Sequence, residues 1–191
     1  MLSAIRHALT REQYLELDVG SEQRHEYYRG EIFAMTGGTF NHASISGNIF
    51  SALKNKLSDS PCQPINGDMR IHTPAGLDTY PDVSIYCGRP ELQDNQRTLL
   101  NPVAIFEVLS PTTRDYDRGD KFSLYRSIPT LQDYVLVDSE AMLAEHFRRL
   151  GDGGWVLREY RAVDARIELI EVGVWLGLDE VYDRLDQLSG G

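Results

Sequence analysis

The chain has 191 residues, of which 41% are hydrophobic and 25% charged, and these fractions are typical of a folded globular protein. This length fits one domain with a sizeable core and is short for two, so we expect a single domain over residues 1–191. The formal net charge of −10 argues against a protein that binds nucleic acid through overall positive charge, although it says nothing about local patches.

The N-terminal segment carries Arg6, Arg11 and Glu12 and has no apolar run long enough for a signal peptide or a membrane span. We therefore expect a cytoplasmic protein with no membrane partner. The cysteines, Cys62 and Cys87, have neither the spacing of a zinc knuckle nor the density of a secreted disulfide scaffold. We expect them to be reduced thiols with a structural role.

The N-terminal region predicts a short helix followed by a hairpin. Thr10 and Gln13 match a capping box, which predicts a helix over TREQYLELD. The following segment, RHEYYRGEIFAMTGG, is rich in β-forming residues on either side of Arg29-Gly30 and ends at Gly37-Gly38. This pattern indicates two strands joined by a turn.

The middle of the chain predicts one long helix and three strands. Apolar residues at helical spacing indicate an amphipathic helix over 41–57, with Ile45, Ile49, Ala52, Leu53 and Leu57 on one face. The expected strands cover about 62–72, 80–87 and 103–109. The third, VAIFEVL, is typical of a central strand covered on both faces, where Glu107 is costly unless it is ligated.

A second helix is expected over 115–127, followed by a buried strand, LQDYVLVD. These elements give an α/β fold with a mixed sheet and an α-β-β-β-α-β core over about 41–138. Three C-terminal segments, MLAEHFRRL, GGWVLREYRA and RIELIEV, predict antiparallel strands that extend or edge the sheet.

Two acidic residues near strand ends suggest a metal site. Asp82 begins the strand in YPDVSIY, and Glu107 lies near the end of VAIFEVL. Mg²⁺ prefers oxygen ligands and is commonly bound by one or two carboxylates. In the helix that follows, Asp117, Lys121 and Tyr125 recur at every fourth position and therefore share a face. If the two strands pair, this helix face brings the ammonium of Lys121 near both acids.

The same segments resemble the Uma-type "putative restriction endonuclease" family of the PD-(D/E)XK nuclease superfamily. The resemblance spans roughly 10–138 and rests on YPDVSIY, IFEVLSPTTRDYDRGDKFSLY and LQDYVLVD, with support from YYRGEIFAMTGGTFNH. It implies a restriction-endonuclease-like fold in which Asp82 and Glu107 are the two motif acids. The chain departs from the superfamily pattern at Leu109, where a lysine is expected, and the resemblance assigns the lysine's place to Lys121.

The resemblance also points to two further polar positions near the site. Glu31, in the hairpin, is expected to complete a second metal site or to orient a water molecule. His42, at the start of the amphipathic helix, is expected to contact a phosphate or to act as a general acid or base. Asp117 and Tyr125 join the set as neighbours of Lys121 on its helix face.

Each of these residues also has a structural explanation. Asp82 fits a turn cap, and Glu107 fits a buried acid paired with an arginine. Lys121 fits either a solvated helix residue or the i+4 partner of Asp117, and His42 fits the polar start of a helix. Position in the chain alone leaves both interpretations open.

We therefore expect a Mg²⁺-dependent endonuclease, with Mn²⁺ as a substitute, that hydrolyses DNA phosphodiester bonds. Asp82 and Glu107 would bind the metal with the Val108 carbonyl, and Lys121 would position the attacking water. Two alternatives stay open. One is a nuclease-fold binding or assembly module with little or no activity, working as a homodimer or with a toxin-like or mobile-element partner, which the net charge of −10 and the displaced lysine favour. The other is a hydrolase acting on RNA or another phosphodiester. If the enzyme cuts both strands of a DNA duplex, a symmetric homodimer is the expected assembly.

Overall fold

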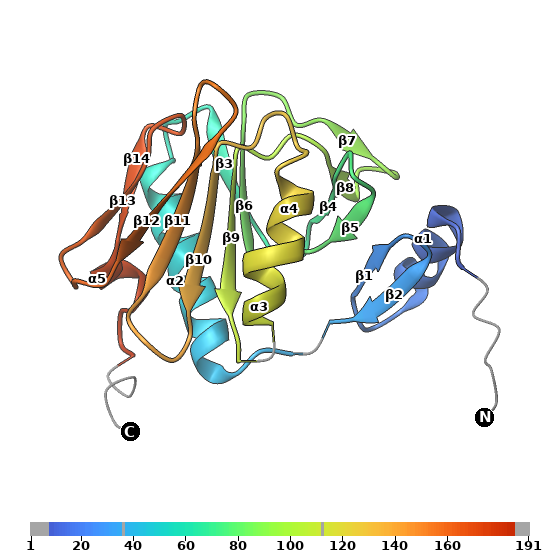
Figure 1. The fold of residues 1–191 in the computed structure, drawn as a ribbon, viewed down its shortest axis with the longest axis horizontal. Helices are drawn as coiled ribbons and strands as arrows, with labels where there is room; N and C mark the ends of the chain where they lie inside the picture. The colour runs from blue at the N-terminus through green and yellow to red at the C-terminus, as the bar shows by residue number, and fades with distance from the viewer. Residues whose placement is uncertain (1–7, 36, 112, 186–191) are drawn as a thin grey trace.

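The structure is a computed structural model that describes residues 8–35, 37–111 and 113–185 (Figure 1). Its helical segments are α1 (Arg11–Gly20), α2 (Phe40–Lys56), α3 (Arg114–Tyr116), the π-helical turn η1 (Asp117–Lys121), α4 (Phe122–Tyr125) and α5 (Leu178–Val181). Its strands are β1 (His25–Tyr28), β2 (Glu31–Ala34), β3 (Cys62–Asn66), β4 (Arg70–His72), β5 (Leu77–Thr79), β6 (Val83–Cys87), β7 (Leu92–Gln93), β8 (Thr98–Leu99), β9 (Ala104–Leu109), β10 (Asp133–Asp138), β11 (Ala144–Arg149), β12 (Trp155–Tyr160), β13 (Arg166–Leu169) and β14 (Val174–Gly177). None of the described helices is long and apolar enough to cross a membrane.

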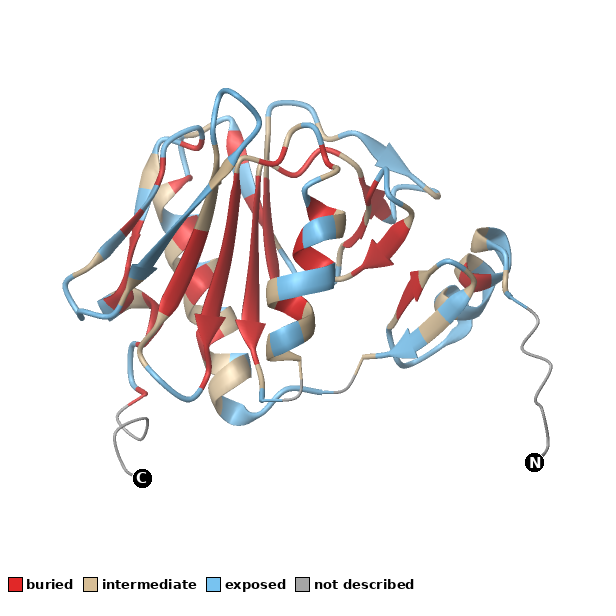
Figure 2. Ribbon diagram, in the orientation of Figure 1, coloured by how far each residue is buried: buried red, intermediate tan, exposed pale blue. Residues whose placement is uncertain are grey.

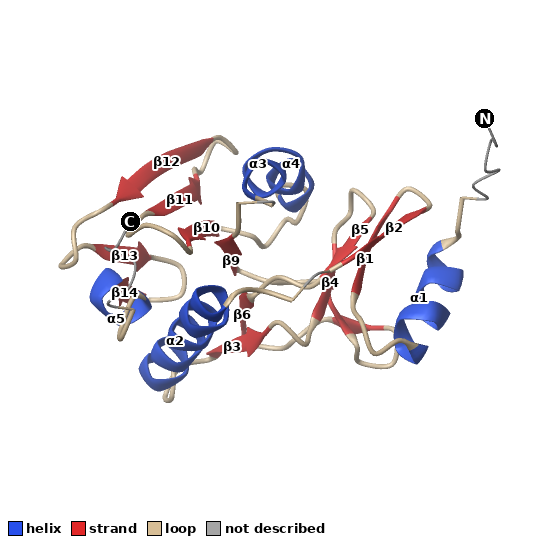
Figure 3. Cartoon of the chain, turned by 90° about the horizontal axis from the view of Figure 1, so that it is seen from below, coloured by secondary structure: helices blue, strands red, loops and turns tan. Residues whose placement is uncertain are grey.

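A mixed sheet with the strand order β12-β11-β10-β9-β6-β3 forms the centre of the molecule. β9 and β10 run parallel, and the other neighbouring strands are antiparallel. A parallel pair needs a crossover, which the α3–α4 segment supplies. The view from below shows α2 on one face of the sheet and α3–α4 on the other (Figure 3). The order α2, β3, β6, β9, α3–α4, β10 confirms the expected α-β-β-β-α-β core.

Alternation along β9 decides which of its side chains face each helix. Phe106 and Val108 pack in the cluster with α2, whereas Ile105 and Leu109 pack in the cluster that contains the residues of α4. Both faces of the central strands are therefore buried (Figure 2). Glu107 follows the alternation onto the α4 face. The strand thus places a carboxylate inside an apolar layer, 5% exposed, beside the helix that follows it.

A second, smaller sheet, in the order β2-β1-β5-β4-β8-β7, holds the N-terminal hairpin against the rest of the chain. The hairpin turns at Arg29 and Gly30, whose φ angles of 49° and 88° suit the two-residue turns that follow strand twist. β1 then pairs with β5. The predicted helix and hairpin are both present, and Thr10 forms the expected capping box with Gln13.

Three expected elements differ in detail. The strand expected over 62–72 is divided into β3 and β4, which lie in different sheets, because Asn66 and Asp68 form a turn between them. The helix expected over 115–127 is α3, η1 and α4, with a π-helical turn at its centre. β11 and β12 extend the main sheet as expected, but β13 pairs with β14 in a separate sheet.

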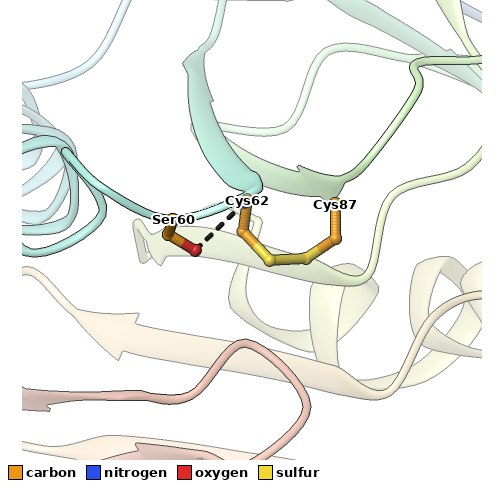
Figure 4. Close-up of a disulfide and its surroundings, with 3 residues drawn as sticks. All are labelled: Ser60, Cys62 and Cys87. Atoms are coloured by element: carbon orange, nitrogen blue, oxygen red, sulfur yellow. Dashed lines mark hydrogen bonds between the residues drawn. A yellow bond between two sulfur atoms is a disulfide. The ribbon is translucent and has the colours of Figure 1, made fainter.

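The expectation of two reduced thiols is wrong for this structure, because Cys62 and Cys87 form a disulfide (Figure 4). β3 pairs antiparallel with β6, and the register sets Cys62 directly opposite Cys87. Spacing along the chain could not reveal this contact, since the register is set by the sheet. The disulfide joins the strands at the end of β6 that lies away from Asp82.

Candidate active site

The register of two neighbouring strands brings Asp82 and Glu107 together. β6 and β9 are antiparallel, with Val83 opposite Phe106. Asp82 directly precedes Val83, and Glu107 directly follows Phe106, so the two carboxylates lie at the same edge of the sheet. The Asp82 carboxylate also accepts a hydrogen bond of 2.7 Å from the backbone N–H of Val108. The pairing of the strands therefore fixes one acid against the strand that carries the other.

His42 reaches the same carboxylate from the first turn of α2. Its Nε2 lies 3.4 Å from Asp82 Oδ2, and this contact raises the pKa of the imidazole. The turn is held in place because Thr39 caps α2 and accepts a hydrogen bond from the His42 N–H. A Cβ atom on Gly38 would lie 2.5 Å from His42 Nδ1, so the ring packs directly on the glycine backbone. The structure thus places His42 beside the acid pair.

Lys121 and Tyr125 bind Glu107 from the α4 side of the sheet. Lys121 Nζ lies 2.9 Å from Glu107 Oε1, and the Tyr125 hydroxyl donates a 2.7 Å hydrogen bond to the same oxygen. Lys121 is only 4% exposed, which excludes the interpretation of it as a solvated helix residue. The structural explanation of Glu107 expected a buried acid paired with an arginine. In the structure, Glu107 contacts a lysine and a tyrosine instead.

Two more carboxylates surround the same ammonium. Glu26 Oε1 lies 2.9 Å from Lys121 Nζ, and Asp117 Oδ1 lies 3.5 Å from it. Asp117 and Lys121 are the two ends of η1, so the π-helical turn presents both to the same side, and such turns are frequent at functional sites. The structure therefore gathers every predicted member of the helix face: Asp117, Lys121 and Tyr125.

The hairpin acid in this cluster is Glu26, which the sequence did not suggest. Glu31 is exposed at the start of β2, whereas Glu26 is buried in β1 and accepts a hydrogen bond from Thr79. The signal in the sequence was weak: Glu26 is a charged residue between His25 and Tyr27 in a short aromatic strand. Alternation along β1 cannot be assigned to a face without knowing that the strand pairs with β5.

Burial and mutual repulsion raise the pKa of two of these acids. The pKa of Glu107 is raised to about 8, first by burial and then by the charges of Asp117 and Asp82, against the opposing effect of Lys121. Burial also raises the pKa of Asp117. For Glu26, burial is outweighed by Lys121 and by the hydrogen bond from Thr79, so its pKa is lowered. Burial and the neighbouring carboxylates therefore favour the protonated forms of Glu107 and Asp117.

The acid pair fits a hard divalent cation. The contacts of Glu107 all use Oε1 and those of Asp82 all use Oδ2, so within the described chain Oε2 and Oδ1 make no hydrogen bond or ion pair. No group of three His, Cys, Asp or Glu side chains in the described residues is arranged as a metal site. Zn²⁺ sites use three or four protein ligands. Mg²⁺ commonly takes one or two carboxylates and keeps several waters, which matches this donor set.

The fold is similar to that of a solved structure described as "a putative nuclease belonging to DUF820" from Anabaena variabilis ATCC 29413. The TM-score is 0.74, and the match covers 91% of this chain and 97% of the other. Because the two sequences are 17% identical, the likeness concerns the fold. The chain has a mixed α/β fold of the restriction-endonuclease-like type.

Two proteins of Synechocystis sp. (strain ATCC 27184 / PCC 6803 / Kazusa) are similar in sequence along nearly their whole length. The uncharacterized protein slr1290 is 37% identical over 175 residues, which cover 91% of each chain. The uncharacterized protein sll1609 is 33% identical over 170 residues, which cover 88% of this chain and 96% of the other.

A family model gives the same assignment over most of the chain. The model of the Uma2 family, described as "Putative restriction endonuclease", matches residues 11–179. This range includes Glu26, His42, Asp82, Glu107 and Lys121. It begins with α1 and ends in α5, so it contains the whole of the main sheet. The chain therefore belongs to the Uma2 family.

Proposed function

We propose that this protein is a Mg²⁺-dependent endonuclease that hydrolyses phosphodiester bonds of DNA, with Mn²⁺ as an effective substitute. The observation that supports this most is the convergence of Asp82 and Glu107 at one edge of the sheet, beside Lys121. Each has one carboxylate oxygen that forms no hydrogen bond or ion pair with the described residues. The restriction-endonuclease-like fold and membership of the Uma2 family support nuclease chemistry.

Asp82 and Glu107 would hold the cation through Oδ1 and Oε2. Val108 is suited to join them, because the N–H and C=O of one strand residue point the same way and its N–H points at Asp82. When bound, a divalent cation neutralises phosphoryl oxygens and favours ionisation of water. The raised pKa of Glu107 agrees with a carboxylate whose charge lacks sufficient compensation in the protein alone.

Lys121 and Tyr125 would orient Glu107 by binding Oε1 and leaving Oε2 toward the cation. The Lys121 ammonium lies 2.9 Å from both Glu26 and Glu107, and its contact to Asp117, at 3.5 Å, is the longest. A water molecule would most easily replace that contact, so Lys121 would hold the attacking water between itself and Asp117. His42, whose pKa is raised by Asp82, would offer a positively charged donor to a phosphate oxygen.

Calorimetric titration with Mn²⁺ and Mg²⁺ tests the metal site. We expect binding by the wild type, loss of binding in Asp82→Ala and Glu107→Gln, and full binding in Asp120→Asn, which removes an exposed carboxylate from the same helix region as Lys121. Supercoiled plasmid DNA incubated with Mn²⁺ tests the reaction, with the same variants. Equal metal binding by the wild type and Asp82→Ala would reject the assignment of the ligands.

A second function is favoured by the net charge of −10, which opposes a polyanionic substrate. In this alternative the chain is a nuclease-fold binding or assembly module with little activity, working as a homodimer or with another protein. Absence of cleavage across duplex DNA, RNA and branched DNA, together with a stable dimer in solution, would favour the module. Cleavage of RNA alone would instead support the proposed metal site and show that the substrate is RNA rather than DNA.

A further inference from the structure

A cleft of ≈ 480 Å³ has no part in the chemistry above, and its lining residue Tyr80 lies two positions before Asp82 in the chain. Its walls come from the end of α1, the turn between β3 and β4, and the β7–β8 hairpin, with Tyr80 between them. Gly67, which directly precedes the lining residue Asp68, connects this side of the cleft with the backbone of Asp82. Arg24 donates a 2.7 Å hydrogen bond to the Gly67 carbonyl, and a Cβ atom on Gly67 would lie 3.5 Å from the Asp82 carbonyl oxygen.

The charged groups that line the cleft balance one another. Guanidinium and carboxylate groups occur there in equal number: Arg24, Arg70 and Arg97 face Asp18, Glu22 and Asp68. Arg24 pairs with Asp68, and Arg70 is paired with Asp18 at 2.9 Å. Within the described chain, Arg97 and Glu22 are left without an ion pair, one of each sign. A phosphate would need an excess of positive charge, which this cleft does not offer.

A nucleobase, by contrast, is neutral and carries both hydrogen-bond donors and acceptors on its edges. Guanidinium and side-chain amide groups bind the acceptor edges of purines, and carboxylates accept hydrogen bonds from amino groups of bases. Arg97, Gln96 and Glu22 supply these three types of group around one cleft. Its volume lies within the range of sites that hold one small organic ligand.

The hairpin that carries two of these groups is held rigidly. Asp94, Asn95 and Gln96 have φ angles of 52°, 57° and 67°, which non-glycine residues seldom adopt in succession. The Asp94 carboxylate stabilises this turn by accepting hydrogen bonds of 2.7 Å from both Arg11 and Thr98. Gln96 ends this run of residues, Arg97 follows it directly, and both are exposed. The backbone that carries these two side chains is therefore set before any ligand binds, which lowers the entropic cost of binding.

We propose that this cleft binds one unpaired nucleobase of the substrate next to the bond that is cut. This inference rests on the proposed function and adds a substrate class to it. A concave site accepts a whole base only when that base is unstacked, because a duplex exposes just the base edges in its grooves. The protein would therefore prefer DNA with single-stranded nucleotides beside the cleavage site, such as tailed or branched duplexes.

Fluorescence anisotropy in EDTA, where no cleavage occurs, measures this preference on the full chain. The probes are a blunt duplex, the same duplex with a short single-stranded tail, and the tailed duplex with abasic residues in the tail. We expect the wild type to bind the normal tail on the order of tenfold more tightly than the other two probes. Arg97→Ala should remove this difference, and Arg158→Ala, which removes an exposed arginine on β12, should retain it.

Each other result overturns the inference in a distinct way. Equal affinity for normal and abasic tails would show that the cleft binds phosphate or nothing. Tighter binding to the blunt duplex would show that unpaired bases are not its ligand. A tail preference that survives in Arg97→Ala would place the base elsewhere on the surface. If the wild type cleaves plasmid DNA with Mn²⁺ in any of these cases, the proposed function stands while the cleft assignment fails. Absence of both binding and cleavage would reject both.

Discussion

Lys121 Nζ lies 2.9 Å from Glu107 Oε1, so the helix that follows β9 binds back onto the end of β9 itself. The same ammonium is 2.9 Å from Glu26, which belongs to the N-terminal hairpin in the other sheet. One buried cation thus joins two parts of the chain that are remote in sequence. Its removal should affect folding as well as catalysis, and the two effects can be separated.

Lys121→Met should destabilise the protein by about 3–5 kcal/mol, because it leaves buried carboxylates without their counter-ion. Adding Glu26→Gln to this variant should restore a substantial part of the loss, since one unpaired charge is removed. Urea unfolding of the wild type, both single variants and the double variant measures the coupling. Strictly additive effects would contradict a direct ion pair. Plasmid cleavage should stay abolished in the stabilised double variant if Lys121 acts in the reaction.

Glu107→Gln should change the pH dependence of stability in metal-free protein. The pKa of Glu107 is raised from 4.5 to about 8, so between these pH values the folded state binds more protons than the unfolded state. This contribution to stability is fully present below pH 4.5 and is lost as the pH rises through about 8. Glutamine keeps the hydrogen bond from Tyr125 and does not titrate. Urea unfolding in EDTA at pH 5 to 9 should therefore give a shallower decline for the variant than for the wild type.

The metal affinity of the wild type should rise over the same pH range, because a cation displaces the proton from Glu107. Calorimetry with Mn²⁺ in two buffers of different ionisation enthalpy measures the protons released. Proton release by the wild type that disappears as the pH rises above about 8 would assign the proton to Glu107. Asp82→Ala and Glu107→Gln should show neither binding nor proton release. Affinity that is flat from pH 6 to 8 would contradict this linkage.

Local patterns in the chain were sufficient to predict the α-β-β-β-α-β core. The helix around Ile45 and Ile49 and the apolar run around Glu107 follow from periodicity, and both are present. The meeting of Asp82 with Glu107 needed one further assumption, that their strands pair. The resemblance to a known family supported that assumption. Periodicity alone does not show which strands pair.

Contacts set by register or by the second sheet could not be predicted in the same way. Glu26 reaches Lys121 because β1 pairs with β5, and the Cys62–Cys87 disulfide forms because β3 pairs with β6 in one register. The break between β3 and β4 depends on an Asn66–Asp68 turn within a segment that otherwise alternates like one strand. The Glu26–Lys121 and Cys62–Cys87 contacts join residues distant in sequence, and short-range patterns carry no information about such pairs.

The disulfide should support stability and leave activity unchanged. It connects residues 25 positions apart, for which loop closure predicts a stabilisation of roughly 3 kcal/mol. It lies at the end of β6 opposite Asp82, so the acid pair does not depend on it. Urea unfolding with and without reductant should show the loss, and the Cys62→Ser/Cys87→Ser double variant should match the reduced wild type. Two reactive thiols in the unreduced, denatured protein would contradict the bond.

Gly38→Ala should reduce activity by displacing His42. A Cβ atom on Gly38 would lie 2.5 Å from Nδ1 and 2.6 Å from Cγ of His42, closer than atoms can approach, so the ring must move away from Asp82. Gly37→Ala is the matched control, because nothing lies within 4 Å of a Cβ atom there. We expect Gly38→Ala to lose plasmid cleavage to the same extent as His42→Ala, roughly 10²-fold if His42 transfers a proton and less if it contacts a phosphate. Gly37→Ala should cleave like the wild type. If Gly38→Ala and His42→Ala both retain full activity while Asp82→Ala does not, His42 has only a structural role in the first turn of α2 and no part in the reaction.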